Sequence, residues 1–240
     1  HGMAAIMNGL ALYNGLIPFG GTFLIFSDYC KPSIRLSALM GLRVIYIFSH
    51  DSIGLGEDGP THQPIEQLSG LRAIPNLNVF RPADMNETLE CWEIALKSKN
   101  TPSVIALSRQ KLKYISKSLS KENKSALGAY VVNLTSHDCK VIILASGSEV
   151  EIAMEAQKSL KENNIDSKVV SVPCQELFDL QTEEYKKEIL EEDTLIVSIE
   201  AGGINCWHKY ISNKGISLGV DSFGKSAPYK EIYEHFGLTS

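Results

Sequence analysis

The sequence lacks several features that would place it in a specialised class of protein. It contains no apolar run of the ~18 residues that a helix needs to cross a bilayer, which argues against a membrane protein. It has no surplus of basic residues, since 23 Lys and Arg against 28 Asp and Glu give a net charge of -5, which argues against a nucleic-acid-binding protein. Its five cysteines form no CxxC pair, and their odd number fits reduced thiols in the cytoplasm better than a disulfide framework.

Predicted strands and helices alternate along the 240 residues, which suffice for one or two domains with a core. Apolar runs predict strands at 17–22, 43–49, 78–80 and 104–107, and again at 140–145, 168–172, 194–199 and 216–220. Between the two sets, residues 111–128 are polar, with five lysines and four serines. We therefore predict an α/β protein with two doubly wound domains, 1–112 and 129–240, joined by a linker at 113–128. Each domain would be a mostly parallel sheet with helices on both faces.

Four helical segments carry more specific expectations. Residues 3–14 predict a buried helix that ends at Gly15, and residues 23–42 predict a helix that Pro32 could break or kink. Asp84, with Glu87 three residues later, predicts the capped start of a helix that runs to about residue 98. The acidic region 176–192 is also predicted to be helical.

The polar loop 50–64, HDSIGLGEDGPTHQP, follows the apolar run 44–48 and contains three glycines, two histidines and three acids. Open α/β sheets place their ligand sites in such loops at the carboxyl ends of strands. The plainer alternative is a turn with solvated charges, because loops are polar in general.

Phe23, Phe26 and Tyr29 recur every three residues and would share one face of a helix. Such a stripe is often plain core. It could also form a stacking surface for a flat heterocycle, because aromatic rings favour offset stacking at ~0.5–1.5 kcal/mol per pair.

The loop also brings together groups suited to proton transfer. His50, Asp58 and His62 lie within 13 residues, and histidine is the side chain that exchanges protons near neutral pH. Structural histidines or a zinc site are alternatives, although the spacing contains no helical HxxxH. Arg109, which follows the strand at 104–107, could grip a phosphate or carboxylate, or could be a surface charge.

Several motifs closely resemble those of transketolases, and the resemblance covers the whole chain. They are the loop 50–64, the segment 22–26 followed by Tyr29, ALSRQ at 106–110, DSFGKSAPY at 221–229 and EHFG at 234–237. The chain would correspond to the family's pyrimidine-binding domain and its C-terminal domain. The resemblance implies a homodimer of three-domain α/β subunits, with active sites between the subunits.

The resemblance also implies roles for individual residues. Phe23, Phe26 and Tyr29 would line the pocket for the aminopyrimidine ring of thiamine diphosphate. His62 would position the reacting groups and shuttle protons, and would be the catalytic residue in this chain.

The substrate would be a sugar phosphate. Asp58 would bind its C2 hydroxyl, and His50 and Arg109 would hold its phosphate group. The expected reaction is transfer of a two-carbon ketol unit from a ketose phosphate to an aldose phosphate. The resemblance thus suggests an enzyme of the pentose phosphate pathway in the cytoplasm.

The expected partner is the family's N-terminal domain, which holds the diphosphate and a divalent cation, Mg or Ca. No metal ligand is expected within this chain. The sequence opens at His1 in mid-helix pattern, which suggests a fragment or processed chain, and the family's ring-protonating glutamate would lie just before His1. The chain alone is therefore expected to be inactive. The alternatives are an inactive assembly or dimerisation fragment and part of a related thiamine enzyme, such as a deoxyxylulose-phosphate-type synthase.

Overall fold

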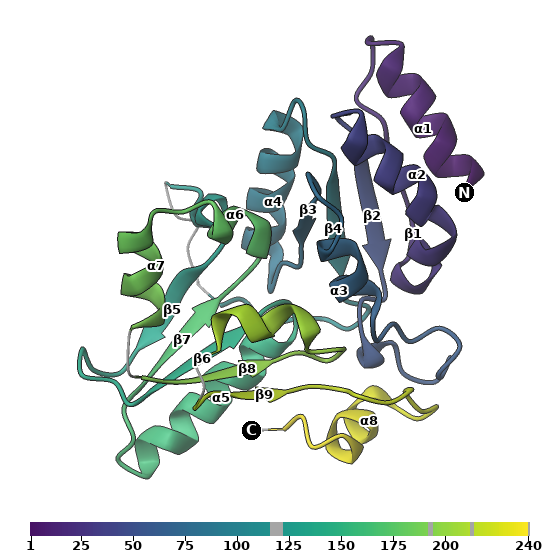
Figure 1. Cartoon of the computed structure of the whole chain (residues 1–240). Coiled ribbons are helices and arrows are strands. Elements are labelled where there is room, and N and C mark those ends of the chain that lie inside the picture. The colour runs from purple at the N-terminus through teal and green to yellow at the C-terminus, as the bar shows by residue number, and fades with distance from the viewer. Residues whose placement is uncertain (116–121, 192–193, 212–213, 240) are drawn as a thin grey trace.

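The computed structural model describes residues 1–115, 122–191, 194–211 and 214–239 and divides them between two sheets (Figure 1). The first sheet contains four parallel strands in the order β1-β2-β4-β3. These strands are β1 (Phe19–Phe23), β2 (Ile45–Ser49), β3 (Asn78–Phe80) and β4 (Ser103–Leu107). Around them lie α1 (Gly2–Leu12), α2 (Ser27–Leu39), α3 (Gln67–Arg72) and α4 (Met85–Lys97).

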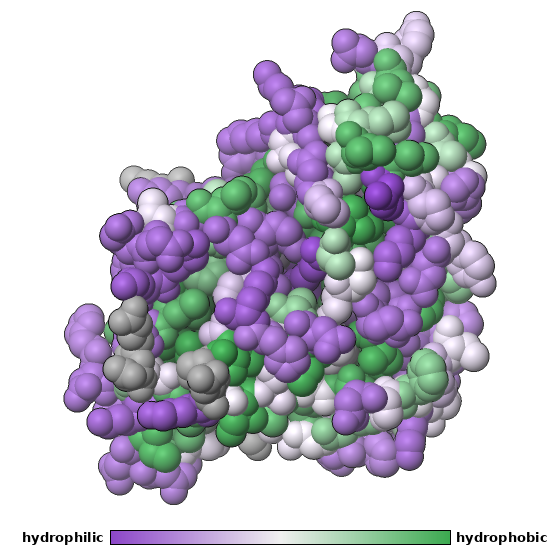
Figure 2. Space-filling model, in the orientation of Figure 1, coloured by the Kyte–Doolittle hydropathy of each residue, from purple (hydrophilic) through white to green (hydrophobic). Residues whose placement is uncertain are grey.

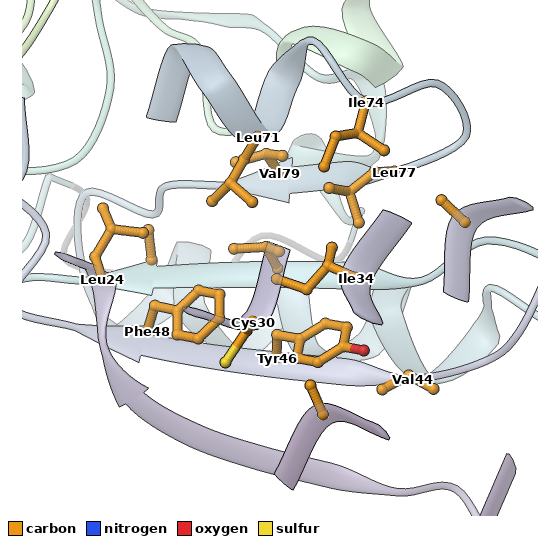
Figure 3. Packing of buried hydrophobic residues seen from close by; sticks show 14 of the residues in the cluster. Leu24, Cys30, Ile34, Val44, Tyr46, Phe48, Leu71, Ile74, Leu77 and Val79 are labelled. Atoms are coloured by element: carbon orange, nitrogen blue, oxygen red, sulfur yellow. The ribbon is translucent and has the colours of Figure 1, made fainter. Parts of the chain in front are cut away.

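Successive side chains of β2 point to opposite faces of this sheet, and both faces are covered. Tyr46 and Phe48 are fully buried in the cluster formed with α1, α2 and α3, and they point toward Ile34 of α2 (Figure 3). Ile45 faces the other way and packs against Cys91 of α4. A strand that is apolar on both faces requires such double cover, so the near-continuous run at 44–48 reflects its central position.

The second sheet has five strands in the order β5-β7-β6-β8-β9, and only β5 is antiparallel to its neighbour. They are β5 (Tyr130–Leu134), β6 (Val141–Ala145), β7 (Ser167–Ser171), β8 (Leu195–Ile199) and β9 (Ile216–Leu218). One face packs on α5 (Glu149–Glu162) and α8 (Tyr229–His235), and the other on α6 (Gln175–Asp179) and α7 (Glu183–Leu190). The predicted α/β class with two mostly parallel sheets is confirmed.

Several predicted elements differ in detail. The strand β5 was not predicted; it is an edge strand with an irregular register between Val131 and Asn133, which blurs its alternation. The first helix ends before Gly15, because Asn14 takes the left-handed conformation there (φ 62°). The acidic region forms two helices, α6 and α7, and Thr182 caps the second by accepting a hydrogen bond from Tyr185 N–H at 3.2 Å.

The helix predicted over 23–42 begins only at Ser27. Phe23 is the last residue of β1, and residues 24–26 form a 3-10 turn between the strand and α2. Pro32 lies inside α2 without ending it. The predicted cap of α4 is confirmed, since Asp84 accepts a hydrogen bond from Glu87 N–H at 2.9 Å.

The two sheets meet across a close junction. Phe80 and Cys174 form an isolated antiparallel bridge, and Arg81 N–H donates to the Pro173 carbonyl at 2.8 Å. Within the predicted linker, residues 124–127 form a 3-10 turn, whereas 116–121 lie outside the described residues. The domain boundaries at 112 and 129 stay a prediction. In the described part of the chain, no helix is both long and apolar enough to cross a membrane.

Candidate active site

The loop 50–64 leaves the carboxyl end of β2 and folds back on itself through unusual backbone angles. His50 has a φ of 61°, which is uncommon for a residue with a side chain, and Gly56 and Gly59 have φ values of 89° and 75°. Ser52 caps a short 3-10 turn, Ile53–Leu55, by accepting a hydrogen bond from Gly54 N–H at 3.2 Å. Because Ile53 and Leu55 are fully buried, the loop is an anchored structure and not a solvated turn.

The predicted aromatic residues and both histidines of the loop form one cluster of rings. Phe23 stacks on His50 with ring centroids 3.7 Å apart and lies 6.1 Å from Phe26. His62 presents its ring edge-on, 5.6 Å from Phe26 and 6.5 Å from Phe23. Tyr29 extends the row at 6.2 Å from Phe26 and is 71% exposed.

This ring cluster does not arise from one helical face, as the spacing had suggested. Phe23 ends a strand, Phe26 lies in the 3-10 turn and Tyr29 lies in the first turn of α2. The turn from strand to helix places the three rings in a row at the edge where the strands end. That edge is also where β2 delivers His50, because β1 and β2 are parallel with Phe23 beside Ser49.

Three charged residues lie near enough to His50 to influence its pKa. Burial lowers the pKa of His50, the nearby Arg109 guanidinium lowers it further, and Asp58 and Asp51 oppose the shift. The side chains of Asp58 and Arg109 therefore act on the same imidazole, although both residues are exposed. His50 Nδ1 lies 2.9 Å from Ser49 Oγ, which fixes the ring orientation.

His62 has a similar arrangement on the other side of the cluster. Its Nδ1 lies 2.9 Å from Thr61 Oγ1. Nε2 is thus the ring nitrogen left for an external partner. A histidine held at one nitrogen and partly exposed can exchange protons at the other.

A buried ionic network, which the sequence analysis did not identify, lies behind the loop. Arg81, directly after β3, is completely buried. Its Nε donates to Asp51 at 2.9 Å, and its Nη1 contacts Glu149 and Glu200 and donates to the Ser146 carbonyl at 3.0 Å. Burial opposes the charge, but the three carboxylates hold the pKa of Arg81 well above its ordinary value. Asp51, next to His50, is thereby connected to the second sheet.

The second domain completes this network. Trp207 Nε1–H donates to Glu200 at 2.9 Å, and the Tyr233 hydroxyl donates to Glu149 at 3.1 Å. The turn Ala145–Glu149 resembles an anion-binding loop in sequence, yet its carbonyl and carboxylate groups surround a cation, Arg81. The sequence could have identified Arg81 as a candidate, because like Arg109 it follows a buried strand at the carboxyl edge of the sheet.

The ring cluster has the chemistry to hold a flat heterocycle beside two imidazoles, with Asp58 and Arg109 close by. Among the described residues, no group of three or more His, Cys, Asp or Glu side chains could hold a metal ion.

Comparison with known proteins gives matches along the whole chain. The transketolase pyrimidine-binding domain matches residues 1–114, and the transketolase-like C-terminal domain matches residues 128–239. A transketolase of Sinorhizobium medicae is 56% identical over 241 residues, which cover 100% of this chain and 34% of that protein. The chain therefore spans about a third of the length of the curated relatives it matches.

Solved structures agree with this result. The transketolase from Leishmania mexicana superposes with a TM-score of 0.94 at 46% identity, covering 100% of this chain and 35% of that one. A structure described as "Split gene transketolase, inactive beta4 tetramer" has a TM-score of 0.83 at 25% identity, covering 99% of this chain and 77% of that one. On these matches, the chain belongs to the transketolase family.

Proposed function

We propose that the chain forms the pyrimidine-binding and C-terminal part of a transketolase that moves a two-carbon ketol unit from a ketose phosphate to an aldose phosphate. The observation that carries the proposal is the ring cluster, in which Phe23, Phe26, His50 and His62 meet at the carboxyl ends of β1 and β2. Tyr29 and Phe26 offer ring faces suited to the aminopyrimidine of thiamine diphosphate. When bound, that cofactor supplies a carbanion equivalent that adds to carbonyl groups.

In this proposal His62 handles protons at its Nε2. It donates a proton to the substrate oxygen when a carbonyl becomes a hydroxyl, and it takes the proton back when the carbonyl re-forms. Its Nδ1 is held by Thr61, so that the ring keeps one orientation throughout.

Substrate recognition falls to the charged groups around the cluster. Asp58 accepts a hydrogen bond from the C2 hydroxyl, and Arg109 and His50 hold the phosphate. The lowered pKa of His50 keeps its imidazole neutral at pH 7. Arg109 therefore supplies the positive charge, whereas His50 contributes a hydrogen bond.

Binding of the diphosphate and of a divalent cation, Mg or Ca, would require the family's N-terminal domain. The relatives are about three times longer than this chain, which leaves room for that domain. Its covalent arrangement can vary in the family, since a split-gene transketolase is among the similar structures.

We further propose that the assembled protein is a homodimer. Large apolar side chains are exposed on α1 and directly after it, among them Ile6 (65%), Leu12 (59%) and Tyr13 (82%). Figure 2 shows hydrophobic atoms gathered over this end of the molecule. Apolar patches of this kind mark protein interfaces.

The five free cysteines fit the cytoplasm, where pentose phosphate metabolism takes place.

A coupled transketolase assay with the N-terminal domain present tests the proposal. The assembled protein should transfer a ketol unit from a ketose phosphate, and Phe26→Ala should weaken thiamine diphosphate binding about 2- to 10-fold through the loss of ring contacts. Leu180→Ala, which truncates an exposed apolar side chain of the second domain, serves as the control. No transfer by the assembled protein would refute the function.

One observation favours a second candidate, an inactive assembly module. The similar split-gene structure is described as an inactive tetramer, and this chain covers 77% of it. Under this reading the chain assembles with itself and shows no activity even when the N-terminal domain is added. The same coupled assay therefore separates the two candidates.

A further inference from the structure

A segment of the second domain, residues 221–228, lies against the loop 50–64 and holds it by hydrogen bonds (Figure 1). Gln63 Nε2 donates to the Lys225 carbonyl and to the Gly56 carbonyl, both at 2.9 Å. Ser226 Oγ donates to the Glu57 carbonyl. We call residues 221–228 the clasp.

The clasp also packs on the loop with little free space. A Cβ atom on Gly224 would overlap Gln63 Oε1 and lie 2.8 Å from its Cδ. Gln63 is only 1% exposed, so its side chain has no open direction in which to move. A Cβ on Gly59 would lie 3.2 Å from Ser226 Cβ, which shows that the backbone of the loop touches Ser226 there as well.

The clasp contacts the residues immediately before and after Asp58 in the chain. The residue before it is held through the Glu57 carbonyl, and the residue after it, Gly59, rests against Ser226. The Asp58 side chain is exposed, so its neighbours determine its position. At the far end of the loop, Gln63 fixes the backbone next to His62 in the same way.

The start of the loop is anchored in the same domain. Ile53 is buried in one apolar cluster with Ile232 of α8, the helix that follows the clasp. The part of the loop between Ile53 and Gln63 is thus attached at both ends to the second domain. The first domain supplies the aromatic rings, and the second domain holds the backbone on either side of Asp58.

We propose that the clasp is a positioning element for Asp58, and that through Ser226 and Gly224 the C-terminal domain sets the preference of the enzyme for acceptors with a 2-hydroxyl group. This inference rests on the proposed function. It gives the C-terminal domain a part in specificity beyond supporting the dimer.

The test compares two aldehyde acceptors, one with and one without a hydroxyl at C2, in the assembled enzyme with its N-terminal domain. Ser226→Ala should lower kcat/KM roughly 2- to 10-fold for the hydroxylated acceptor and leave the other acceptor unchanged, because one hydrogen bond that holds the Asp58 backbone is lost. Ser226 is exposed, so the variant should keep its unfolding midpoint. Ser222→Ala, an exposed serine of the same segment, is the matched control.

Two further variants separate positioning from a general structural effect. Gly224→Ala should give a larger loss with the same acceptor selectivity, since it displaces Gln63. In an Asp58→Ala background, Ser226→Ala should have no further effect, because the group it positions is gone. Equal losses for both acceptors, or additive losses in that background, would overturn the inference.

The outcomes also separate this inference from the proposed function. If the wild-type assembly transfers no ketol unit, or if Asp58→Ala does not discriminate between the acceptors, the proposed function or the role of Asp58 fails. If both hold and Ser226→Ala behaves like Ser222→Ala, only the clasp inference fails.

Discussion

Replacing Glu87 with glutamine should change the way in which stability depends on pH. Glu87 is on α4 of the first domain, is 2% exposed, and contacts the second domain through the Tyr130 hydroxyl at 2.7 Å and the Ser171 hydroxyl at 2.5 Å. Burial raises its pKa from 4.5 to about 7, against the hydrogen bonds from Ser171, Ala83 N–H and Tyr130. The fold therefore favours the protonated carboxyl group.

The size of the effect follows from this shift. Between pH 4.5 and 7 the unfolded chain has released the proton of Glu87 while the folded chain still holds it, so stability falls as the pH rises. At about 1.36 kcal/mol per pH unit, the full shift corresponds to roughly 3.4 kcal/mol. Between pH 5 and 7 roughly 2 kcal/mol of it is lost, because at pH 7 the folded chain still holds about half of its Glu87 protons. This contribution is fully present below pH 4.5 and is lost as the pH rises through 7.

Urea unfolding of the wild type and of Glu87→Gln at pH 5, 6 and 7 measures this effect. The variant should gain roughly 2 kcal/mol on the wild type between pH 5 and 7, because the amide does not titrate and other groups cancel in the difference. Glu93→Gln, at an exposed position of the same helix, is the control and should not gain in this way. A constant difference between wild type and Glu87→Gln, or one that moves the other way, would refute the reasoning.

Three other outcomes are expected. Arg81→Met should lower the free energy of unfolding by about 3–5 kcal/mol, because it leaves buried carboxylates without their cation. The control Lys209→Met, at a surface ion pair, should lower it by less than ~1 kcal/mol. Similar urea midpoints for the two variants would contradict this. Gly128→Ala should lower the free energy of unfolding by more than the ~1–2 kcal/mol expected for its left-handed conformation, since the new Cβ would also meet backbone atoms. The control Gly9→Ala has open space around it and should be neutral or stabilising in thermal melts. In the assembled enzyme, His50→Ala should raise KM about 10-fold for phosphorylated donors and less for unphosphorylated ones. Because the pKa of His50 is lowered, this gap should widen only at a pH below the ordinary histidine range, where the imidazole becomes charged. Equal effects on both kinds of donor would argue against its role.

Much of the fold could be predicted from the sequence because most of its strands carry apolar runs. Among the described residues, eight of the nine strands were predicted, and the central strands β2, β4, β6, β7 and β8 have the most continuous runs because they are covered on both faces. The ninth, β5, lies at an edge and has an irregular register, so neither a long run nor a clean alternation marks it. The start of the helix was predicted too early, at Phe23, because ring spacing does not reveal that residues 24–26 form a 3-10 turn.

The candidate site could be predicted in part. The sequence motifs identified the rings and the loop, and the structure places Phe23, Phe26, Tyr29, His50 and His62 together. Their roles stay predictions. Contacts between residues far apart in sequence, such as Gln63 with Lys225 and Arg81 with Glu200, could not be predicted, because no local pattern links residues separated by more than a hundred positions.

The network around Arg81 has a consequence for how the chain melts. The Arg81 guanidinium pairs with Asp51 of the first half and with Glu149 and Glu200 of the second. If either half unfolds, the other therefore keeps buried charges without their partners. A calorimetric trace of the chain should show a single heat-capacity peak with equal van't Hoff and calorimetric enthalpies. Either half expressed by itself should be a poorly packed polypeptide that proteases digest quickly.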